Sequence, residues 1–258
     1  MTAILLDVDG VLHVSGEPIP GAADALRRLR GAGHRIRYVT NSTTMSRRQL
    51  GEMLREIGFA IDDDELQTTG GVAARVLRGK RVLALTMPGI LDDLEGIELI
   101  GMNAEAVLVG GADENDEPGR VFSYLNLNRA FLELRAGADL YCLHKNRWWQ
   151  TAEGPRLDSG AIVAGLEYAA QIEATVLGKP SPEYFTAALE AIDADAELTW
   201  MVGDDIEGDV AGAQRHGMRT VLVRTGKFRP DDLEHVSTVP DGIVSSIAQL
   251  PEWLEQNL

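Results

Sequence analysis

Short apolar runs alternate with segments of helical period along the first part of the chain. The run Ala3–Val8 is followed by a helix-period segment at Gly21–Ala32, a second apolar run at Arg35–Thr40 and a second helix-period segment at Ser46–Gly58. This alternation is typical of βαβ units, whose parallel strands are buried on both faces of a sheet. The pattern therefore predicts an α/β fold at the amino-terminal end.

The same alternation returns near the carboxyl end of the chain. A strand is predicted at Thr199–Val202, a helix at Val210–His216, a strand at Thr220–Val223 and a last strand and helix between Ile243 and Glu255. The triplet Ser181–Glu183 opens another helix, since it supplies an N-cap serine, a proline at the first helical position and an acid in the first turn. We expect both ends of the chain to share one parallel sheet.

The middle of the chain carries strands and helices of its own. Strands are predicted at Arg81–Thr86, Ala106–Val109 and Asp139–Cys142, and helices at Ser123–Ala136 and Ser159–Ala170. Because this stretch is as long as a typical domain, it is better explained as an insertion than as a loop. We expect residues 1–71 and 178–258 to form one α/β core domain and residues 72–177 to form an inserted α/β domain.

Two carboxylates follow the first predicted strand directly, in the run Asp7-Val8-Asp9-Gly10. Parallel α/β sheets bind ligands at the carboxyl ends of their strands. Asp7 and Asp9 share a face if the strand stays extended, and two such acids repel unless a cation or a proton lies between them. The alternative is a simple turn built from Asp and Gly.

Three further segments favour a phosphoryl-transfer site over that turn. The second strand ends in hydroxyl and amide side chains, a lysine precedes a predicted helix, and the strand at Thr199–Val202 runs into another pair of acids. Together these strand ends and turns bring a metal site, a hydroxyl and a lysine to one edge of the sheet. Taken singly, the threonine could be only a strand end and the lysine only a surface residue. The residues concerned are Thr40, Asn41, Lys179, Asp204, Asp205 and Asp209.

The charge and the composition of the chain limit the classes of partner that it can bind. Forty acidic residues against 24 basic ones give a formal charge of −16, a field that repels nucleic acid and anionic lipid. The single cysteine, Cys142, cannot form an intrachain disulfide, which favours a reducing compartment. The sequence has no basic leader and no apolar run long enough to cross a membrane. We expect a cytoplasmic protein that binds neither nucleic acid nor membrane.

In the order and spacing of all four motifs, the chain resembles phosphatases of the haloacid-dehalogenase superfamily that carry a large α/β cap. Within that superfamily it is similar to the group that contains the phospholysine phosphohistidine inorganic pyrophosphate phosphatase. The resemblance is carried by Tyr38–Thr43, Gly178–Phe185, Gly203–Met218 and Leu222–Lys227. It implies an α/β fold with a Rossmann-like parallel-sheet core, an inserted α/β cap domain and a homodimer formed through the cap.

The resemblance also implies a role for each motif residue. Asp7 is the expected nucleophile, which forms an aspartyl-phosphate, and Asp9 the expected acid and base. Mg²⁺ is expected on Asp7, the backbone carbonyl of Asp9 and Asp204. The phosphate is expected to contact Thr40, Asn41 and Lys179. The remaining acids, Asp205 and Asp209, are expected to orient metal-bound waters or the lysine.

The cap is expected to choose the substrate, because the motif residues recognise only the phosphoryl group. In this family the segment after the strand Asp139–Cys142 faces the active site. Its positive charge and aromatic surface suit an anionic or planar leaving group, and the candidate contacts are His144, Asn146, Arg147 and Trp148. As an alternative, Trp148 and Trp149 straddle the cap sheet, with one of them in its core.

We therefore expect a Mg²⁺-dependent phosphatase that acts on a small phosphorylated metabolite, whether a phosphate monoester, pyrophosphate or a phosphoamide. A haloacid dehalogenase needs neither Asp9 nor Asp204, and a receiver domain has about half this length and no inserted domain. A non-catalytic protein on the same fold, which binds metal and phosphate without turnover, is the alternative from another functional class.

Overall fold

The computed structural model describes residues 2–111, 120–151, 154–231, 233 and 238–258. The chain divides into two compact units, and the boundary between them is crossed four times. Unit 1 consists of Met1–Thr40, Leu50–Gln67 and Lys179–Leu258, and unit 2 of Asn41–Gln49 and Thr68–Gly178.

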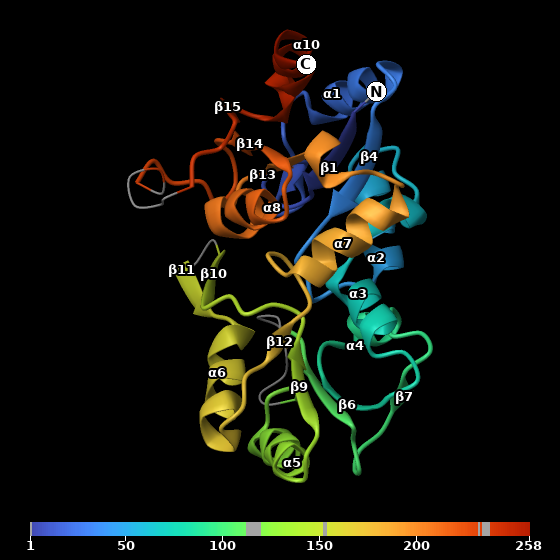
Figure 1. Ribbon diagram of the computed structural model, residues 1–258, viewed down its shortest axis with the longest axis vertical. Helices are drawn as coiled ribbons and strands as arrows, with labels where there is room; N and C mark the ends of the chain where they lie inside the picture. Colours follow the sequence, from blue (N-terminus) through green and yellow to red (C-terminus); the bar gives the residue numbers. More distant parts are fainter. Residues whose placement is uncertain (1, 112–119, 152–153, 232, 234–237) are drawn as a thin grey trace. The chain divides into compact units, whose positions relative to one another are not determined.

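Unit 1 is built on a six-stranded sheet in the order β15-β14-β13-β1-β4-β5, in which every neighbouring pair is parallel. Figure 1 shows β1, β4, β13 and β14 side by side. The parallel sheet predicted from the two ends of the chain is thus confirmed. The strands are β1 Ala3–Asp7, β4 Arg35–Val39, β5 Leu66–Gln67, β13 Thr199–Gly203, β14 Arg219–Val223 and β15 Gly242–Val244.

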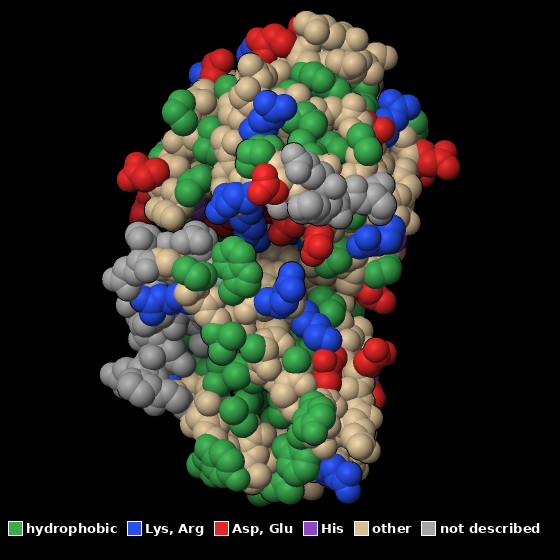
Figure 2. Space-filling model, turned by 90° about the vertical axis from the view of Figure 1, so that its left-hand side faces the viewer, with side chains coloured by type: hydrophobic (Ala, Val, Ile, Leu, Met, Phe, Trp, Pro, Cys, Tyr) green, Lys and Arg blue, Asp and Glu red, His purple; other side chains and the backbone are tan. Residues whose placement is uncertain are grey.

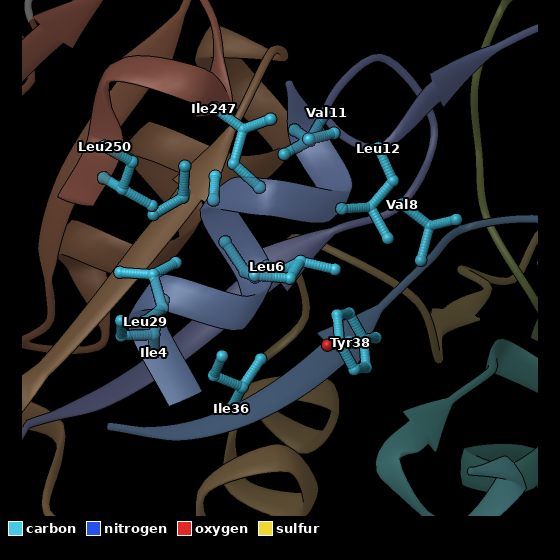
Figure 3. Close-up of a cluster of buried hydrophobic side chains, with 14 of the residues drawn as sticks. Ile4, Leu6, Val8, Val11, Leu12, Leu29, Ile36, Tyr38, Ile247 and Leu250 are labelled. Carbon is cyan, nitrogen blue, oxygen red and sulfur yellow. The ribbon is translucent and has the colours of Figure 1, made fainter. Parts of the chain in front are cut away.

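One face of this sheet is covered by α1 and α10. Ile4 and Leu6 of β1 lie in one buried cluster with Leu29 of α1 and with Ile247 and Leu250 (Figure 3). Side chains alternate along a strand, so this cluster takes every second residue of β1. The helices of unit 1 are α1 Ala22–Gly31, most of α2 Arg47–Glu56, α7 Pro182–Ala191, α8 Gly212–Arg215 and α10 Leu250–Asn257. Its short elements are β2 His13–Val14, β3 Glu17–Pro18 and the 3₁₀ turns Asp63–Glu65, Ala196–Leu198 and Ile247–Gln249.

The helix expected at Val210–His216 begins earlier than predicted and is not regular. A π-helical segment, η3, spans Ile206–Ala211 and continues into the short α8. The Asp205 carboxylate accepts the backbone N–H groups of Glu207 and Gly208, and its carbonyl accepts those of Asp209 and Val210. The apolar period starts only at Val210, so it gave no sign of this capped first turn.

Unit 2 has a parallel sheet of its own, in the order β12-β9-β8-β6-β7. Its core joins Val107 and Val109 of β8 to Ala130 and Leu134 of α5 and Val163 of α6. The strands are β6 Arg81–Leu85, β7 Glu98–Leu99, β8 Ala106–Val109, β9 Asp139–Cys142 and β12 Thr175–Val176. The helices are α3 Thr69–Val76, α4 Pro88–Leu91, α5 Tyr124–Arg135 and α6 Ser159–Ala170.

The helices differ in length and in the side chains that they expose. No described helix of either unit is long and apolar enough to cross a membrane. Hydrophobic side chains gather in the lower half of the face drawn in Figure 2. Among the exposed apolar residues of unit 2 are Tyr124, Leu125 and Leu132 of α5 and Tyr168 of α6.

Unit 2 also contains a pair of antiparallel strands that the sequence pattern did not predict. β11 (Gly154–Leu157) pairs antiparallel with β10 (Trp148–Thr151), and the two form a separate sheet. Trp148 lies in β10 and about half of its side chain is exposed. The alternative in which Trp148 and Trp149 straddle the cap sheet differs from the structure in one respect, because β10 does not belong to the five-stranded sheet. Gly154 and Pro155 are ordinary loop signals, and only their pairing with β10 makes this segment a strand.

Candidate active site

The ends of three neighbouring strands bring Asp7, Thr40 and Asp204 to one edge of the unit 1 sheet. Asp7 is the last residue of β1, and the flanking strands β4 and β13 end directly before Thr40 and Asp204. Since the strands are parallel, their carboxyl ends lie on the same edge. All three side chains are buried.

Lys179 is buried between two of the acids. Its Nζ lies 2.6 Å from Oδ1 of Asp7 and 2.7 Å from Oδ1 of Asp209. Only 5% of the lysine is exposed, so both ion pairs are shielded from water. Burial would lower the pKa of Lys179, but the carboxylates of Asp209 and Asp7 outweigh it and hold that pKa well above its usual value. The two ion pairs therefore favour the ammonium form of Lys179.

One ammonium does not balance the acids around it. Carboxylate oxygens of Asp7, Asp204 and Asp209 all lie within 4.8 Å of one another. Burial, and then the charge of Asp209, raise the pKa of Asp7 well above its usual value, although Lys179 opposes them. The same two causes raise the pKa of Asp204 to about 7. Protons or a cation must therefore neutralise part of this charge.

A divalent cation fits these donors. Gly10 and Gly226 both have positive φ, and a Cβ on either would clash with the Asp204 carboxylate. The backbone N–H of Lys227 donates to Oδ2 of Asp204 over 2.6 Å, which fixes the direction of that carboxylate. Carboxylate oxygens held in this way are the ligands that hard cations prefer. The buried acids thus indicate a divalent metal site.

Asp209 and Asp205 also have partners on the protein. Oδ1 of Asp209 pairs with the Lys179 ammonium, and Oδ2 accepts the backbone N–H of Asp205 over 3.2 Å. Asp205 caps η3 and lies 3.5 Å from Nζ of Lys227. Burial would raise the pKa of Asp205, but Lys227 and the helix N–H groups hold it below its usual value.

Thr40 is fixed from two sides. Its hydroxyl donates to Oδ2 of Asp9 over 3.2 Å, and its backbone N–H donates to the buried phenol oxygen of Tyr184 over 2.8 Å. That phenol also lies 2.8 Å from the carbonyl of Thr40 and 2.9 Å from that of Gln67, either of which can accept its proton. Asp9 is more than half exposed, and His13 lies 3.7 Å from its other oxygen.

Asn41 and the candidate specificity residues belong to unit 2. Asn41 is bonded directly to Thr40 and packs against Gly178, where a Cβ would clash with the Asn41 amide and the carbonyl of Leu143. The four candidate specificity residues follow β9, and the last of them, Trp148, is the first residue of β10. His144 is buried, whereas Arg147 and Trp148 are exposed. Their approach to a leaving group stays a prediction.

Sequence reasoning gave no role to three residues that contact the site, namely Tyr184, Gly226 and Lys227. Tyr184 follows the predicted helix start Ser181–Glu183, and its place in the sequence carries no sign of the bonds to Thr40 and Gln67. The run Thr225-Gly226-Lys227 directly follows the predicted strand Thr220–Val223 and Arg224, at the same edge as the acids. That position was the available signal.

Comparison with known proteins agrees with the class that this architecture indicates, a hydrolase that transfers a phosphoryl group. A family model described as haloacid dehalogenase-like hydrolase matches residues 4–100, and one described as HAD-hydrolase-like matches residues 176–250. The chain belongs to the haloacid dehalogenase-like hydrolases, and within them it is a phosphatase.

Three similar proteins illustrate the relationship. The phospholysine phosphohistidine inorganic pyrophosphate phosphatase of Xenopus laevis is 41% identical over 98% of this chain and 94% of its own length. The p-nitrophenyl phosphatase from Archaeoglobus fulgidus has a TM-score of 0.90 at 28% identity and covers 98% of each chain. A glycerol phosphate phosphatase from Mycobacterium tuberculosis, in complex with magnesium, has a TM-score of 0.85 at 26% identity over 96% of this chain and 76% of its own.

The close approach of Gly10 to Asp204 makes a matched pair of variants informative. Gly10 and Gly16 share a φ of 82°, but only at Gly10 would a Cβ meet another residue. Gly10→Ala should displace Asp204 and weaken the binding of a divalent cation, with Mg²⁺ as the probe, by roughly 10- to 100-fold. Gly16→Ala carries the same backbone strain, about 1 kcal/mol, and should bind the metal normally. Equal metal affinity in both variants, measured by calorimetry, would contradict the role of Gly10 in leaving room for the Asp204 carboxylate.

The phenol of Tyr184 should contribute to stability through its contacts with the strand ends. Tyr184→Phe removes a buried hydroxyl that bonds to Thr40 and Gln67, and should lower the free energy of unfolding by about 1 kcal/mol or more. Tyr168→Phe is the control, because that side chain is 88% exposed and its change should stay within about 0.5 kcal/mol. Chemical denaturation of both variants measures the difference, and equal losses would refute this role.

Proposed function

We propose that this phosphatase hydrolyses a small phosphorylated metabolite through a covalent phosphate on Asp7, with Mg²⁺ as its cofactor. The observation that carries the proposal is the pairing of the buried Asp7 carboxylate with the Lys179 ammonium, 2.6 Å away, beside further acids. With a cation bound beside it, the Asp7 carboxylate would be ionised and held in a fixed position, which suits a nucleophile towards phosphorus.

In the first half of the reaction an oxygen of Asp7 attacks the phosphorus atom. A bond forms between that oxygen and phosphorus, and the bond from phosphorus to the leaving oxygen breaks. Asp9 donates a proton to the leaving oxygen. More than half of the Asp9 side chain is exposed, so the residue can exchange its proton with solvent between turnovers.

In the second half the phosphate leaves Asp7. The Asp9 carboxylate accepts a proton from a water molecule, the water oxygen bonds to phosphorus, and the bond between phosphorus and Asp7 breaks. Inorganic phosphate is released and the Asp7 carboxylate is restored. The 3.2 Å hydrogen bond from the Thr40 hydroxyl supports this role, because it keeps Asp9 near the phosphate-binding strand end.

The metal would be held by the carboxylates of Asp7 and Asp204 and by the backbone carbonyl of Asp9. When bound, it neutralises charge on the phosphoryl oxygens and on the acids. Without a cation the buried acids would repel a phosphate dianion, since unit charges ~4 Å apart cost several kcal/mol even at an effective dielectric of about 20. Asp209 is proposed to hold Lys179 in place, and Asp205 to cap η3 and hold Lys227.

Phosphate oxygens would be bound by the hydroxyl of Thr40, the backbone N–H of Asn41 and the ammonium of Lys179. Lys179 already lies against the nucleophile, so it meets the charge that develops on the transferred group. The rigid backbone of Thr40, bonded to Tyr184, supports the same assignment.

Unit 2 is proposed to act as the cap that selects the leaving group, with residues 72–177 as its inserted part. Arg147 and Trp148 are exposed there, which suits contact with an anionic or planar group. The relatives and structural neighbours are named for phosphorylated amino acids, pyrophosphate, nitrophenyl phosphate and glycerol phosphate, which together indicate small substrates. A homodimer formed through unit 2 is also proposed, since α5 and α6 carry exposed apolar side chains, and sedimentation would test it.

Phosphate release from a panel of phosphorylated metabolites, pyrophosphate and p-nitrophenyl phosphate tests the proposal. Release should require Mg²⁺ and stop when EDTA removes it, and Asp7→Asn should reduce release to background while the protein stays folded by circular dichroism. Substantial turnover in that variant would remove Asp7 from the nucleophile's role. Binding of metal and vanadate without turnover of any compound by the wild-type protein would favour a non-catalytic binding protein.

A further inference from the structure

The proposed phosphate-binding pair Thr40–Asn41 lies across the boundary between the two units. Thr40 is the last residue of its segment in unit 1, and Asn41 is the first residue of unit 2. The two are joined by one peptide bond, so the position of the Asn41 N–H depends on how unit 2 holds the residues that follow.

The three residues that follow Thr40 each contact another part of unit 2. Asn41 packs against Gly178, whose missing side chain makes room for the amide. The carbonyl of Ser42 accepts the Thr69 hydroxyl over 3.1 Å. Thr43 is buried beside Gly111, where a Cβ would clash with the threonine hydroxyl.

Thr43 has a further contact within unit 2, with the side chain of His144. Nε2 of His144 lies 3.3 Å from the Thr43 hydroxyl, and only 3% of the histidine is exposed. On the other side of the ring, Nδ1 accepts the backbone N–H of Asn146 over 3.3 Å. Because Nδ1 accepts a hydrogen bond, the ring proton of the neutral form lies on Nε2, which therefore donates to Thr43.

The same ring nitrogen faces the start of α6. Nε2 lies 3.7 Å from Oδ1 of Asp158, the N-cap residue, which already accepts the backbone N–H of Ser159 over 2.7 Å. The imidazole thus lies between three parts of unit 2, namely the segment after Asn41, the chain that follows β9 and the N-terminus of α6. A side chain buried in this way is suited to hold backbone in place and poorly suited to touch a leaving group.

We propose that His144 is a positioning residue, which holds Asn41–Thr43 so that the Asn41 N–H points to the phosphate. The inference rests on the proposed function and adds a distinguishing consequence. A residue that contacts the leaving group changes the ranking of substrates. A residue that positions the phosphate site changes the affinity for every substrate, and for inorganic phosphate, by the same factor.

The test compares His144→Ala with His144→Gln, because the glutamine amide can donate to Thr43 in place of Nε2. Val163→Ala is the control, since it opens a cavity in the unit 2 core on α6 and leaves the Thr43 contact in place. The dissociation constant of inorganic phosphate is measured by calorimetry in the presence of Mg²⁺, and kcat/KM with p-nitrophenyl phosphate and glycerol phosphate.

In His144→Ala, phosphate binding should weaken by about three- to tenfold, the effect of one hydrogen bond. kcat/KM should fall by the same factor for both substrates. His144→Gln should stay within about twofold of the wild type, and so should Val163→Ala despite its lower unfolding midpoint. Unchanged phosphate binding in His144→Ala, an equal loss in Val163→Ala, or a loss confined to one substrate would overturn the proposal. Since phosphate binding needs no turnover, a wild-type protein without activity would fail the proposed function alone.

Discussion

The structure of the site depends on one buried ammonium group shared by two carboxylates. Lys179 is the first residue of unit 1 after the long segment of unit 2. Its ammonium pairs with Asp7 of β1 and with Asp209 of η3. Removing one partner from such a buried set leaves an uncompensated charge, which costs several kcal/mol. The strand ends, the irregular helix after β13 and the glycines around Asp204 all serve to hold this set of charges. The remaining negative charge is the reason a divalent cation belongs here.

Much of the fold follows from patterns that are local in sequence. Most of the parallel strands of both sheets were predicted within one or two residues, because buried β-branched runs and their turn signals are contiguous. The two-residue strands β5, β7 and β12 were not predicted. The acids and the threonine at strand ends could be placed on one edge, because parallel strands share that edge. No local pattern marks the burial of His144 against Thr43 or the bonds between Tyr184 and Thr40, since these residues lie about 100 or more apart in the chain. The β10–β11 hairpin was missed because a strand that begins with Gly-Pro is recognised only by its partner.

Two buried side chains hold the residues around the proposed phosphate-binding pair, each within its own unit. Tyr184 fixes the backbone of Thr40 in unit 1, and His144 fixes the hydroxyl of Thr43 in unit 2. Neither residue would react with the substrate. In the proposed function the chemistry rests on acids and a lysine of unit 1, and the choice of leaving group is proposed for unit 2. This division also explains how one set of motif residues can serve relatives that are named for different phosphorylated compounds.

The most direct test of the account is a calorimetric titration of Mg²⁺ into the wild-type protein, Asp204→Asn and Asp205→Asn. The two variants remove the same charge from adjacent residues, but only Asp204 belongs to the buried acid cluster, whereas Asp205 caps η3. The account predicts one saturable site in the wild type that is lost in Asp204→Asn and kept in Asp205→Asn. A wild-type protein without a saturable site, or equal losses in both variants, would contradict it.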